Sequence, residues 1–461
     1  MMQAMKSLYY QLPVSWRSAA ASSYGYYLRY WRYGDATEQL VQEALARESW
    51  SSAQVTAWQQ EKLAEMLDRA ATQVPYYRAY WQERRRRGDK ASWEELANWP
   101  VLGKEPLRTQ PEAFLADDSS EWRLLRMNTS GTSGKPITVW RDRAAVQGYY
   151  ALFEARWRRW YGLNFDDRWA ILGGKIVAPV AQKKPPFWVW NQGLNQLYMS
   201  TLHLEPTNIS AYLAALEEHK VVYLFGYVSS LRTLARMVLE QNLKVPPLRH
   251  VIANAEPLPQ HQRDMIEEAF GCPLHNTYGM AEAVAGASEC EAGYMHLWPE
   301  AGVVEVLADG SDARVPAGVD GRLICTGLLN RAMPLVRYEV GDRGALSPEG
   351  QCSCGRTLPR LERLVGRLSD NIVAADGRRI FQVDQTLYAL AIKEAQMIQE
   401  RIGEVRVKVI PAETYSQKDA DLIVKRLQNL AGQLDVKVEV VDEIPRSANG
   451  KFRAVISKVD T

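Results

Sequence analysis

Short apolar runs alternate with segments of helical periodicity between residues 125 and 345, and this alternation limits the possible folds more than any other feature of the chain. The helical segments include ISAYLAALEEHK (209–220) and PQHQRDMIEEAFG (259–271). Strands that alternate with helices form parallel sheets covered by helices. We therefore predict an α/β fold with strands in RWAILGG (168–174), VVYLFGY (221–227), HVIANAE (250–256) and PLHNTYG (273–279).

The flanking regions have other patterns. Residues 1–100 are predicted to be mostly helical, and residues 302–346 to form a small antiparallel subdomain. After Gly366, the strands EVRVKVIPA and VKVEVVDEIP and a helix over 418–434 predict a small α+β unit. We expect a large N-terminal domain over residues 1–366 with a helical leader over 1–100, and a mobile C-terminal domain over residues 367–461.

Composition and charge exclude several classes of protein. The 461 residues are 46% hydrophobic and 24% charged, which is typical of a folded soluble protein. The net charge of +2 argues against nucleic acid as the main partner. We expect a cytoplasmic protein without a transmembrane segment, because no uncharged stretch is continuously apolar and the start of the chain lacks a signal-peptide pattern. Aromatic and Arg residues between Met5 and Tyr33 leave open a peripheral membrane contact, but Pro13 interrupts the segment and a packing face explains it equally well. We therefore favour an N-terminal cap on the core for this segment.

The segment MNTSGTSGKPITV (127–139) is the most informative motif. Small residues and two glycines let the backbone turn tightly, so that its N–H groups converge on phosphate oxygens, and Lys135 adds a positive charge. It is not the P-loop pattern, because the spacing of Gly131 and Gly134 is too short and Pro136 follows the lysine. The residues alone are compatible with a polyphosphate site or with a flexible turn.

Five motifs resemble those of the adenylate-forming superfamily: TSGTSGKP (129–136), NTYGMAE (276–282), RYEVGD (337–342), GRLSD (366–370) and PRSANGK (445–451). Within it, NAEPL (254–258), CSCGR (352–356) and the leader resemble phenylacetate-CoA ligase and CapK-type proteins. The resemblance implies adenylation of a carboxylic acid by ATP with Mg²⁺, then acyl transfer to coenzyme A. Transfer to an amine, giving an amide as in polysaccharide biosynthesis, is the alternative. A non-catalytic nucleotide-binding scaffold and a zinc-dependent nucleic-acid binder belong to other classes, and the first conflicts with the intact motifs.

The resemblance also assigns roles to individual residues. Tyr278 would stack on adenine, Glu282 would coordinate Mg²⁺, and Asp342 would accept hydrogen bonds from the ribose hydroxyls. Arg367 would contact ribose or phosphate, and Lys451 would bridge the substrate carboxylate and the α-phosphate. The loop Thr129, Ser130, Gly131, Thr132, Ser133, Gly134 and Lys135 would hold the β- and γ-phosphates, and the adenine would lie against Ala255, Glu256, Pro257, Asn276 and Thr277.

Two assignments are less direct. Gly226 and Tyr227 precede the nucleotide-binding strip and are candidates for the acyl pocket, where core packing is the alternative. The family commonly carries Asp or Lys two residues after the Gly-Arg of its hinge, whereas this chain has Ser369 followed by Asp370. The residue about which the C-terminal domain rotates, the acid, and the choice between a monomer and a homodimer stay open.

Three cysteines and a histidine form a candidate zinc site. Cys290 and His296 are followed some 55 residues later by Cys352 and Cys354, and three thiolates with one imidazole satisfy tetrahedral Zn²⁺. The spacing differs from that of zinc fingers, so free thiols are the alternative. The resemblance to phenylacetate-CoA ligases favours a structural Zn²⁺. The two remaining cysteines, at 272 and 325, are predicted to be core thiols.

Overall fold

The computed structural model describes residues 9–10, 12–129, 137–179, 181–367, 372–375, 379–380, 383–387, 390–446 and 452–459. The chain divides into two compact units. The first comprises Met1–Val340 and Ala345–Glu362, and the second comprises Gly341–Gly344 and Arg363–Thr461. The functional domain boundary after residue 366 stays a prediction.

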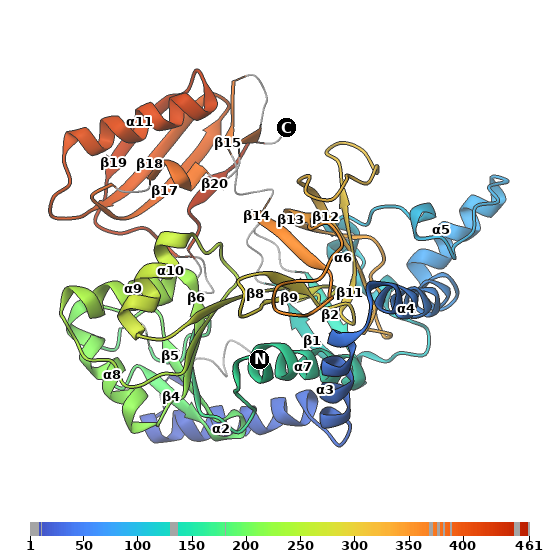
Figure 1. Cartoon of the computed structure of the whole chain (residues 1–461), viewed down its shortest axis with the longest axis horizontal. Coiled ribbons are helices and arrows are strands. Elements are labelled where there is room, and N and C mark those ends of the chain that lie inside the picture. Colours follow the sequence, from blue (N-terminus) through green and yellow to red (C-terminus); the bar gives the residue numbers. More distant parts are fainter. Residues whose placement is uncertain are drawn as a thin grey trace. The chain divides into compact units, whose positions relative to one another are not determined.

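The leader is helical, as predicted. Helix α4 begins at a capping box in which the Ser51 hydroxyl accepts a hydrogen bond from the Gln54 backbone and the Gln54 side chain accepts one from the Ser51 backbone. Figure 1 shows the helices of the first unit, which are α2 (Val14–Arg32), α3 (Thr37–Ala46), α4 (Ser52–Gln73), α5 (Pro75–Arg86), α6 (Lys104–Thr109), α7 (Arg143–Phe153), α8 (Ile209–Glu218), α9 (Val228–Glu240) and α10 (Gln260–Phe270).

Among the described residues, one twelve-stranded sheet has the order β11-β12-β13-β14-β10-β9-β8-β7-β6-β3-β5-β4. Strands β5, β3, β6, β7 and β8 are parallel, whereas β8 to β10 and β11 to β12 pair antiparallel. This confirms the α/β prediction, although the antiparallel region continues the large sheet because β10 pairs with β14. The strands are β3 (Trp169–Gly173), β4 (Trp188–Asn191), β5 (Gln196–Ser200), β6 (Tyr223–Tyr227), β7 (His250–Asn254), β8 (Leu274–Gly279), β9 (Gly286–Glu289), β10 (Met295–Leu297), β11 (Gly302–Leu307), β12 (Gly321–Gly327), β13 (Tyr338–Leu346) and β14 (Arg360–Arg367).

Side chains of the parallel strands pack on both faces of the sheet. In β6, Leu224 belongs to the core formed with α8, α9 and α10, whereas Tyr223 packs on the other face with Tyr161. In β7, Val251 packs on the first face and Ile252 on the second, because successive side chains of a strand point to opposite faces of the sheet. Covered faces on both sides explain why these strands are almost continuously apolar.

Among the described residues, the second unit contains a four-stranded sheet in the order β19-β18-β17-β20, one α-helix and the short 3-10 helix Val383–Leu387. Helix α11 begins at a capping box of Ser416 and Asp419 and ends before Gly432, where φ is +77°. The helix predicted over 418–434 is therefore confirmed with an earlier end. The elements are β15 (Ile372–Val373), β16 (Arg379–Ile380), β17 (Ile392–Arg401), β18 (Glu404–Pro411), α11 (Gln417–Ala431), β19 (Asp435–Val440) and β20 (Val455–Ser457).

Within the described ranges, we find no helix that is both long and apolar enough to span a bilayer.

Candidate active site and metal centre

The carboxyl ends of β6, β7 and β8 bring several predicted site residues into one row. Strand pairing aligns Tyr227 with Asn254, and Asn254 with Thr277. Residues 255–257 directly follow β7, so the strip expected to flank adenine continues from this row. In open α/β sheets, ligands bind outside the carboxyl ends of the strands. The sheet thus brings together residues expected to bind acyl group and nucleotide.

Gly226 and Tyr227 end β6. A Cβ on Gly226 would approach the Leu172 carbonyl oxygen to 3.1 Å and the Leu231 side chain to 3.2 Å, so the close packing of β3, β6 and α9 favours glycine here. Burial raises the pKa of Tyr227, and nearby Glu256 raises it further, so the phenol is neutral at pH 7. The structure therefore gives Gly226 a packing role and leaves its contact with substrate a prediction.

Glu256 caps helix α9. Its carboxylate accepts hydrogen bonds from the Ser229 backbone N–H, at 2.6 Å, and from the Ser229 hydroxyl, at 3.0 Å. A carboxylate at this end of a helix satisfies free N–H groups and interacts favourably with the helix dipole. The chain enters this position through Ala255, whose φ of +66° is uncommon for a residue with a side chain. Glu256 thus joins the carboxyl end of β7 to the start of α9.

Asn276 and Thr277 fix β8 against its neighbours. The Asn276 N–H donates to the Glu289 carboxylate at 2.7 Å. The buried Thr277 hydroxyl donates to the Ala253 carbonyl at 2.8 Å and accepts from the Asn254 amide at 2.9 Å. These bonds hold Tyr278, the next residue, which is 8% exposed. Stacking of Tyr278 on adenine stays a prediction.

Glu282 is a buried carboxylate, 8% exposed, just beyond β8. Its Oε1 accepts a hydrogen bond from the Tyr338 hydroxyl at 2.7 Å. The buried guanidinium of Arg141 donates to the Ala281 carbonyl and interacts electrostatically with Glu282. The hydrogen bond from Tyr338 fixes the orientation of the Glu282 carboxylate, and its coordination of Mg²⁺ stays a prediction.

The phosphate-loop motif begins where a hairpin ends. Strands β1 (Leu125–Asn128) and β2 (Thr138–Arg141) pair antiparallel, and Thr129 and Ile137 extend the pairing. The Thr129 hydroxyl accepts from the Ile137 N–H at 2.9 Å, so Thr129 closes the base of the loop. The other predicted loop residues lie outside the described residues: Ser130, Gly131, Thr132, Ser133, Gly134 and Lys135.

The three remaining predicted residues belong to the second unit. Asp342 lies inside β13 rather than after it, because the strand continues past Gly341, whose φ is +85°. Arg367 is the last residue of β14, and its side chain lies outside the described part of the chain. Lys451 also lies outside the described residues, as do Ser369 and Asp370 at the predicted hinge.

The four candidate metal ligands are brought together, as the sequence predicted. The ligand atoms of Cys290, His296, Cys352 and Cys354 all lie within 4.8 Å of one another. The Sγ atoms of Cys290 and Cys352 are 3.9 Å apart, and Cys354 Sγ is 3.4 Å from His296 Nε2. Tetrahedral Zn²⁺ with Zn–S bonds of about 2.3 Å places its sulfur ligands about 3.8 Å apart. The donor set and its spacing therefore fit Zn²⁺.

Two similar turns present the cysteines. Cys290 and Cys352 each begin a C-x-x-G turn, and the glycines, Gly293 and Gly355, have φ values of +81° and +88°. In both turns, the N–H of the glycine donates to the carbonyl of the cysteine. Glycine adopts this left-handed conformation without steric cost. The repeated C-x-x-G pattern is a local sequence signal for these turns, and the prediction from the cysteine spacing did not use it.

His296 is oriented by a second partner. Its Nδ1 lies 3.2 Å from the Leu358 carbonyl, and because a carbonyl only accepts, Nδ1 carries the proton. Nε2, which faces Cys354, is then the atom free to bind a metal, the usual arrangement for metal-binding histidines. Burial lowers the pKa of His296 to about 4, so the imidazole is neutral at pH 7.

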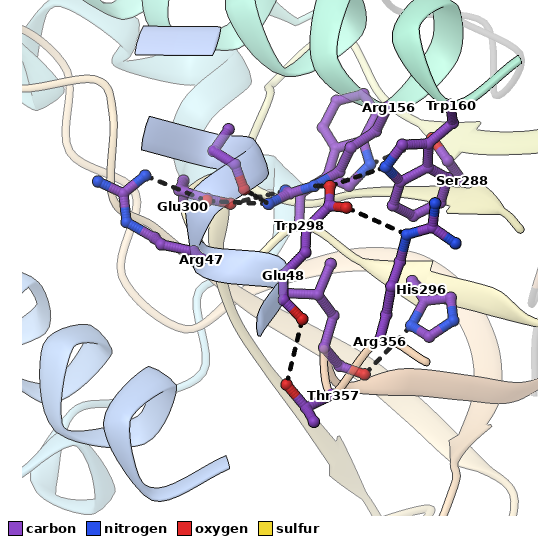
Figure 2. Close-up of polar contacts among 12 residues, drawn as sticks. Arg47, Glu48, Arg156, Trp160, Ser288, His296, Trp298, Glu300, Arg356 and Thr357 are labelled. Carbon is purple, nitrogen blue, oxygen red and sulfur yellow. Dashed lines mark hydrogen bonds and ion pairs between the residues drawn. The ribbon is translucent and has the colours of Figure 1, made fainter. Parts of the chain in front are cut away.

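A network of ion pairs and hydrogen bonds joins Arg356, which follows the turn Cys352–Gly355, to Glu48 in the leader (Figure 2). Arg356 donates to Glu48 at 3.1 Å, and Glu48 accepts from Trp160 at 2.7 Å. Arg156, fully buried, also reaches Glu48 and makes two hydrogen bonds, of 2.7 and 2.9 Å, to Glu300. Sequence reasoning missed this network, because its members lie far apart in the chain.

Comparison with known proteins agrees with this geometry. Residues 46–329 match the family model of the AMP-binding enzyme, and residues 372–458 match the CapK C-terminal domain. Protein CapK of Staphylococcus aureus is 24% identical over 383 residues, covering 81% of this chain and 82% of CapK. Phenylacetate-coenzyme A ligase of Pseudomonas putida is 25% identical over 357 residues, covering 74% of this chain and 77% of the ligase.

A solved structure supports the same fold. 2-Hydroxyisobutyryl-CoA ligase in complex with 2-HIB-AMP matches with a TM-score of 0.69 and 22% identity, covering 89% of this chain and 91% of the ligase. The AMP-binding match spans more than half of the chain. The chain therefore belongs to the AMP-binding enzyme family and is an adenylate-forming ligase with homology to CapK and phenylacetate-CoA ligase.

Proposed function

We propose that this ligase activates a carboxylic acid with ATP and transfers the acyl group to coenzyme A. In the first step a carboxylate oxygen attacks the α-phosphorus of ATP, and the bond to pyrophosphate breaks, giving acyl-AMP. In the second step the coenzyme A thiolate attacks the acyl carbon, and AMP leaves with the bridging oxygen. The first step works mainly by positioning and by neutralising phosphate charge.

The observation that carries the proposal is the row of residues at the carboxyl ends of β6, β7 and β8. Tyr227, the Ala255–Pro257 strip and Tyr278 come from neighbouring parallel strands, at the edge where α/β sheets bind nucleotides. The hydrogen bonds from Ser229 to Glu256 and from Thr277 to Ala253 support this edge. A rigid edge of this kind suits a reaction that depends on positioning.

The residue roles follow the sequence expectations. The loop over Thr129–Lys135 would hold the β- and γ-phosphates, and Glu282 would hold Mg²⁺, which supplies positive charge at the phosphates. Asp342 would bind the ribose, Arg367 would contact ribose or phosphate, and Lys451 would bridge the substrate carboxylate and the α-phosphate. These roles assume that the chain consists of an adenylate-forming domain over residues 1–366 and a mobile domain over residues 367–461. A homodimer also remains a prediction.

Coenzyme A is the proposed acceptor because two similar proteins carry it in their names, the phenylacetate-coenzyme A ligase and the 2-hydroxyisobutyryl-CoA ligase. An amine acceptor is the alternative. Supplying coenzyme A or candidate amines to the enzyme after adenylation, and identifying the thioester or amide by mass spectrometry, distinguishes them.

The adenylation step is tested by pyrophosphate exchange. We expect acid-dependent incorporation of labelled pyrophosphate into ATP in a screen of carboxylic acids. Glu282→Gln should lower the exchange rate by roughly a hundredfold, because it removes charge from the proposed Mg²⁺ ligand. Glu240→Gln, which alters an exposed ion pair with Arg236, is the matched control and should exchange like the parent. If none of the acids supports pyrophosphate exchange although ATP still binds, the result would favour a nucleotide-binding scaffold.

We also propose that Cys290, His296, Cys352 and Cys354 bind one structural Zn²⁺. The distances between the ligand atoms support coordination by four protein side chains, which leaves no coordination position for a substrate. The ion would therefore stabilise the fold and would take no part in the reaction. It would join the turn after β9 to the turn before β14.

Removal of a ligand tests the zinc proposal. We expect the purified protein to contain one zinc per chain by elemental mass spectrometry, and Cys354→Ser to lose it and to melt at a lower temperature. Cys272→Ser alters a buried cysteine outside the cluster and is the matched control, with zinc content unchanged. Equal zinc content in both variants would contradict the assignment.

A further inference from the structure

Helix α2 exposes an unusual number of aromatic side chains. Among the described residues, seven aromatic side chains are exposed; two, Trp122 and Tyr294, lie elsewhere, and five lie on this helix of 19 residues. These five, which we call the α2 aromatic face, are Trp16, Tyr24, Tyr26, Tyr27 and Tyr30. A cluster of this kind on a surface marks an interaction site, whereas scattered exposed apolar residues do not.

The opposite side of α2 is fixed to the first unit, so the exposure is built into the fold. A Cβ on Gly25 would lie 1.7 Å from Asn191 Oδ1, and one on Gly193 would lie 2.4 Å from the Tyr26 nitrogen. Ser22 accepts a hydrogen bond from the Gln192 N–H at 3.1 Å. In Figure 1, α2 runs beside β4 and α7 at the lower edge of the view. These close contacts hold the side of α2 that carries Ser22 and Gly25 against the first unit.

Helix α2 itself carries only basic charged residues, although Glu218 of α8 lines a pocket with Val14 and Ser18. Residues 1–34 contain four basic residues and no Asp or Glu. The elements that contact α2 most extensively are α7, β4 and the short helix η7 (Gln192–Leu194), and none of these three contains an acidic residue. Arg143 donates to the Tyr30 carbonyl at 3.0 Å, and its guanidinium lies 4.0 Å from the centre of the Tyr30 ring. Arg29 is exposed on the same last turn.

The residue types on the face distinguish among occupants. A helix that binds in the groove of a partner protein presents apolar anchors at i, i+3 or i+4, and i+7, which from Trp16 would fall at Ala19 or Ala20 and at Ser23. Here Trp and Tyr alternate with Ala19, Ala20 and Ser23, and no exposed Leu, Ile, Met or Phe lies on α2. Tyr and Trp combine an apolar ring with a polar tip and are enriched where a bilayer meets water. Basic residues beside such a face attract anionic headgroups.

We propose that the α2 aromatic face binds the surface of an anionic lipid bilayer, with the rings at the headgroup level and Arg29 and Arg143 near lipid phosphates. The helix would lie in the plane of the interface. Binding would bring the ligase to the membrane without insertion of a spanning segment. The proposal is independent of the acid that the enzyme activates.

Flotation with vesicles tests this proposal. We expect the full chain to float with vesicles of phosphatidylglycerol and phosphatidylcholine, much less with phosphatidylcholine alone, and less as salt is raised. The triple variant W16S/Y27S/Y30S should lower the bound fraction by roughly tenfold or more. R29Q/R143Q should weaken binding to the anionic vesicles and remove most of the salt dependence.

The matched control is W122S/Y294S, which removes the two exposed aromatic residues elsewhere and should bind vesicles like the parent. Circular dichroism and pyrophosphate exchange in solution should be unchanged in the triple variant, because its residues are exposed and lie outside the proposed active site. Parent protein that does not float, or an equal loss in the control, would overturn the proposal. So would a dimer in solution that W16S/Y27S/Y30S abolishes while vesicles have no effect.

Discussion

Lys451→Ala is expected to lower acid-dependent pyrophosphate exchange by roughly a hundredfold to a thousandfold. In the proposed first step, negative charge increases where the carboxylate oxygen attacks the α-phosphate. An ammonium group at this place therefore stabilises the transition state more than the bound substrates. The lysine ends the motif PRSANGK, inside the segment that matches the CapK C-terminal domain. Transfer of the acyl group from preformed acyl-AMP to coenzyme A should be affected much less, because the lysine acts in the first step.

Lys437→Ala is the matched control for this variant. Lys437 lies in β19 of the same unit, with its side chain 72% exposed, and its neighbour Asp435 forms only a surface ion pair. Exchange should match that of the parent. If Lys451→Ala exchanged pyrophosphate at the parent rate, the proposed role of the C-terminal domain in adenylation would be wrong.

Glu300→Gln is expected to destabilise the first unit by about 3 kcal/mol. The substitution keeps the shape of the side chain but leaves Arg156, which is fully buried, without its bidentate partner. Removing one member of a buried ion pair costs far more than losing an exposed pair, because the remaining charge stays out of water. Thermal unfolding followed by circular dichroism measures the effect.

The pH dependence of this effect has a definite sign. Burial alone would raise the pKa of Glu300, but Arg156, a backbone hydrogen bond and Arg47 together outweigh it, and the pKa is lowered from its ordinary value of 4.5. A carboxylate with a lowered pKa stabilises the folded state above its unfolded pKa, and this contribution is lost as the pH falls. The difference in melting temperature between the parent and Glu300→Gln should therefore shrink below about pH 4.5.

Two further variants make the Glu300 result specific. Glu83→Gln alters exposed ion pairs with Arg86 and Arg87 and should change the stability by less than about 1 kcal/mol. An apolar pair, Arg156→Met with Glu300→Leu, should recover much of the loss because no unpaired charge remains. An equal loss in Glu83→Gln would show that burial does not determine the cost.

Much of the fold could be predicted because its signals are local. The apolar runs that became β3, β6, β7 and β8 lie between helical segments of ordinary length, so their order along the chain fixed a parallel arrangement. The cluster of cysteines and His296 was predicted mainly from the resemblance to phenylacetate-CoA ligases, because the spacing alone left free thiols as the alternative. Cys352 and Cys354 supply two of the four candidate ligands from one segment, and Cys290 and His296 supply the other two from a second segment.

The rest depended on tertiary contacts. Strands β4 and β5 were missed because WVWNQGLNQLYMS is interrupted by polar and glycine residues, and packing against α2 stabilises this hairpin. Strand β17 was missed because IKEAQMIQER has the residue types of a helix, although β18 and β20 pair with it on both sides. Glu48, Arg156 and Glu300 have no spacing that relates them before folding. Glu256 was expected beside adenine, and its role as the cap of α9 depends on Ser229, 27 residues away.

The central claim, that the chain activates a carboxylate as an acyl-adenylate, is tested most directly by an oxygen label. An acid that supports pyrophosphate exchange is prepared with ¹⁸O in its carboxylate and converted with ATP and coenzyme A, and the nucleotide is analysed by mass spectrometry. Attack on the α-phosphate predicts AMP that carries one ¹⁸O atom from the acid. Label in inorganic phosphate together with ADP, or AMP without label, would contradict the account.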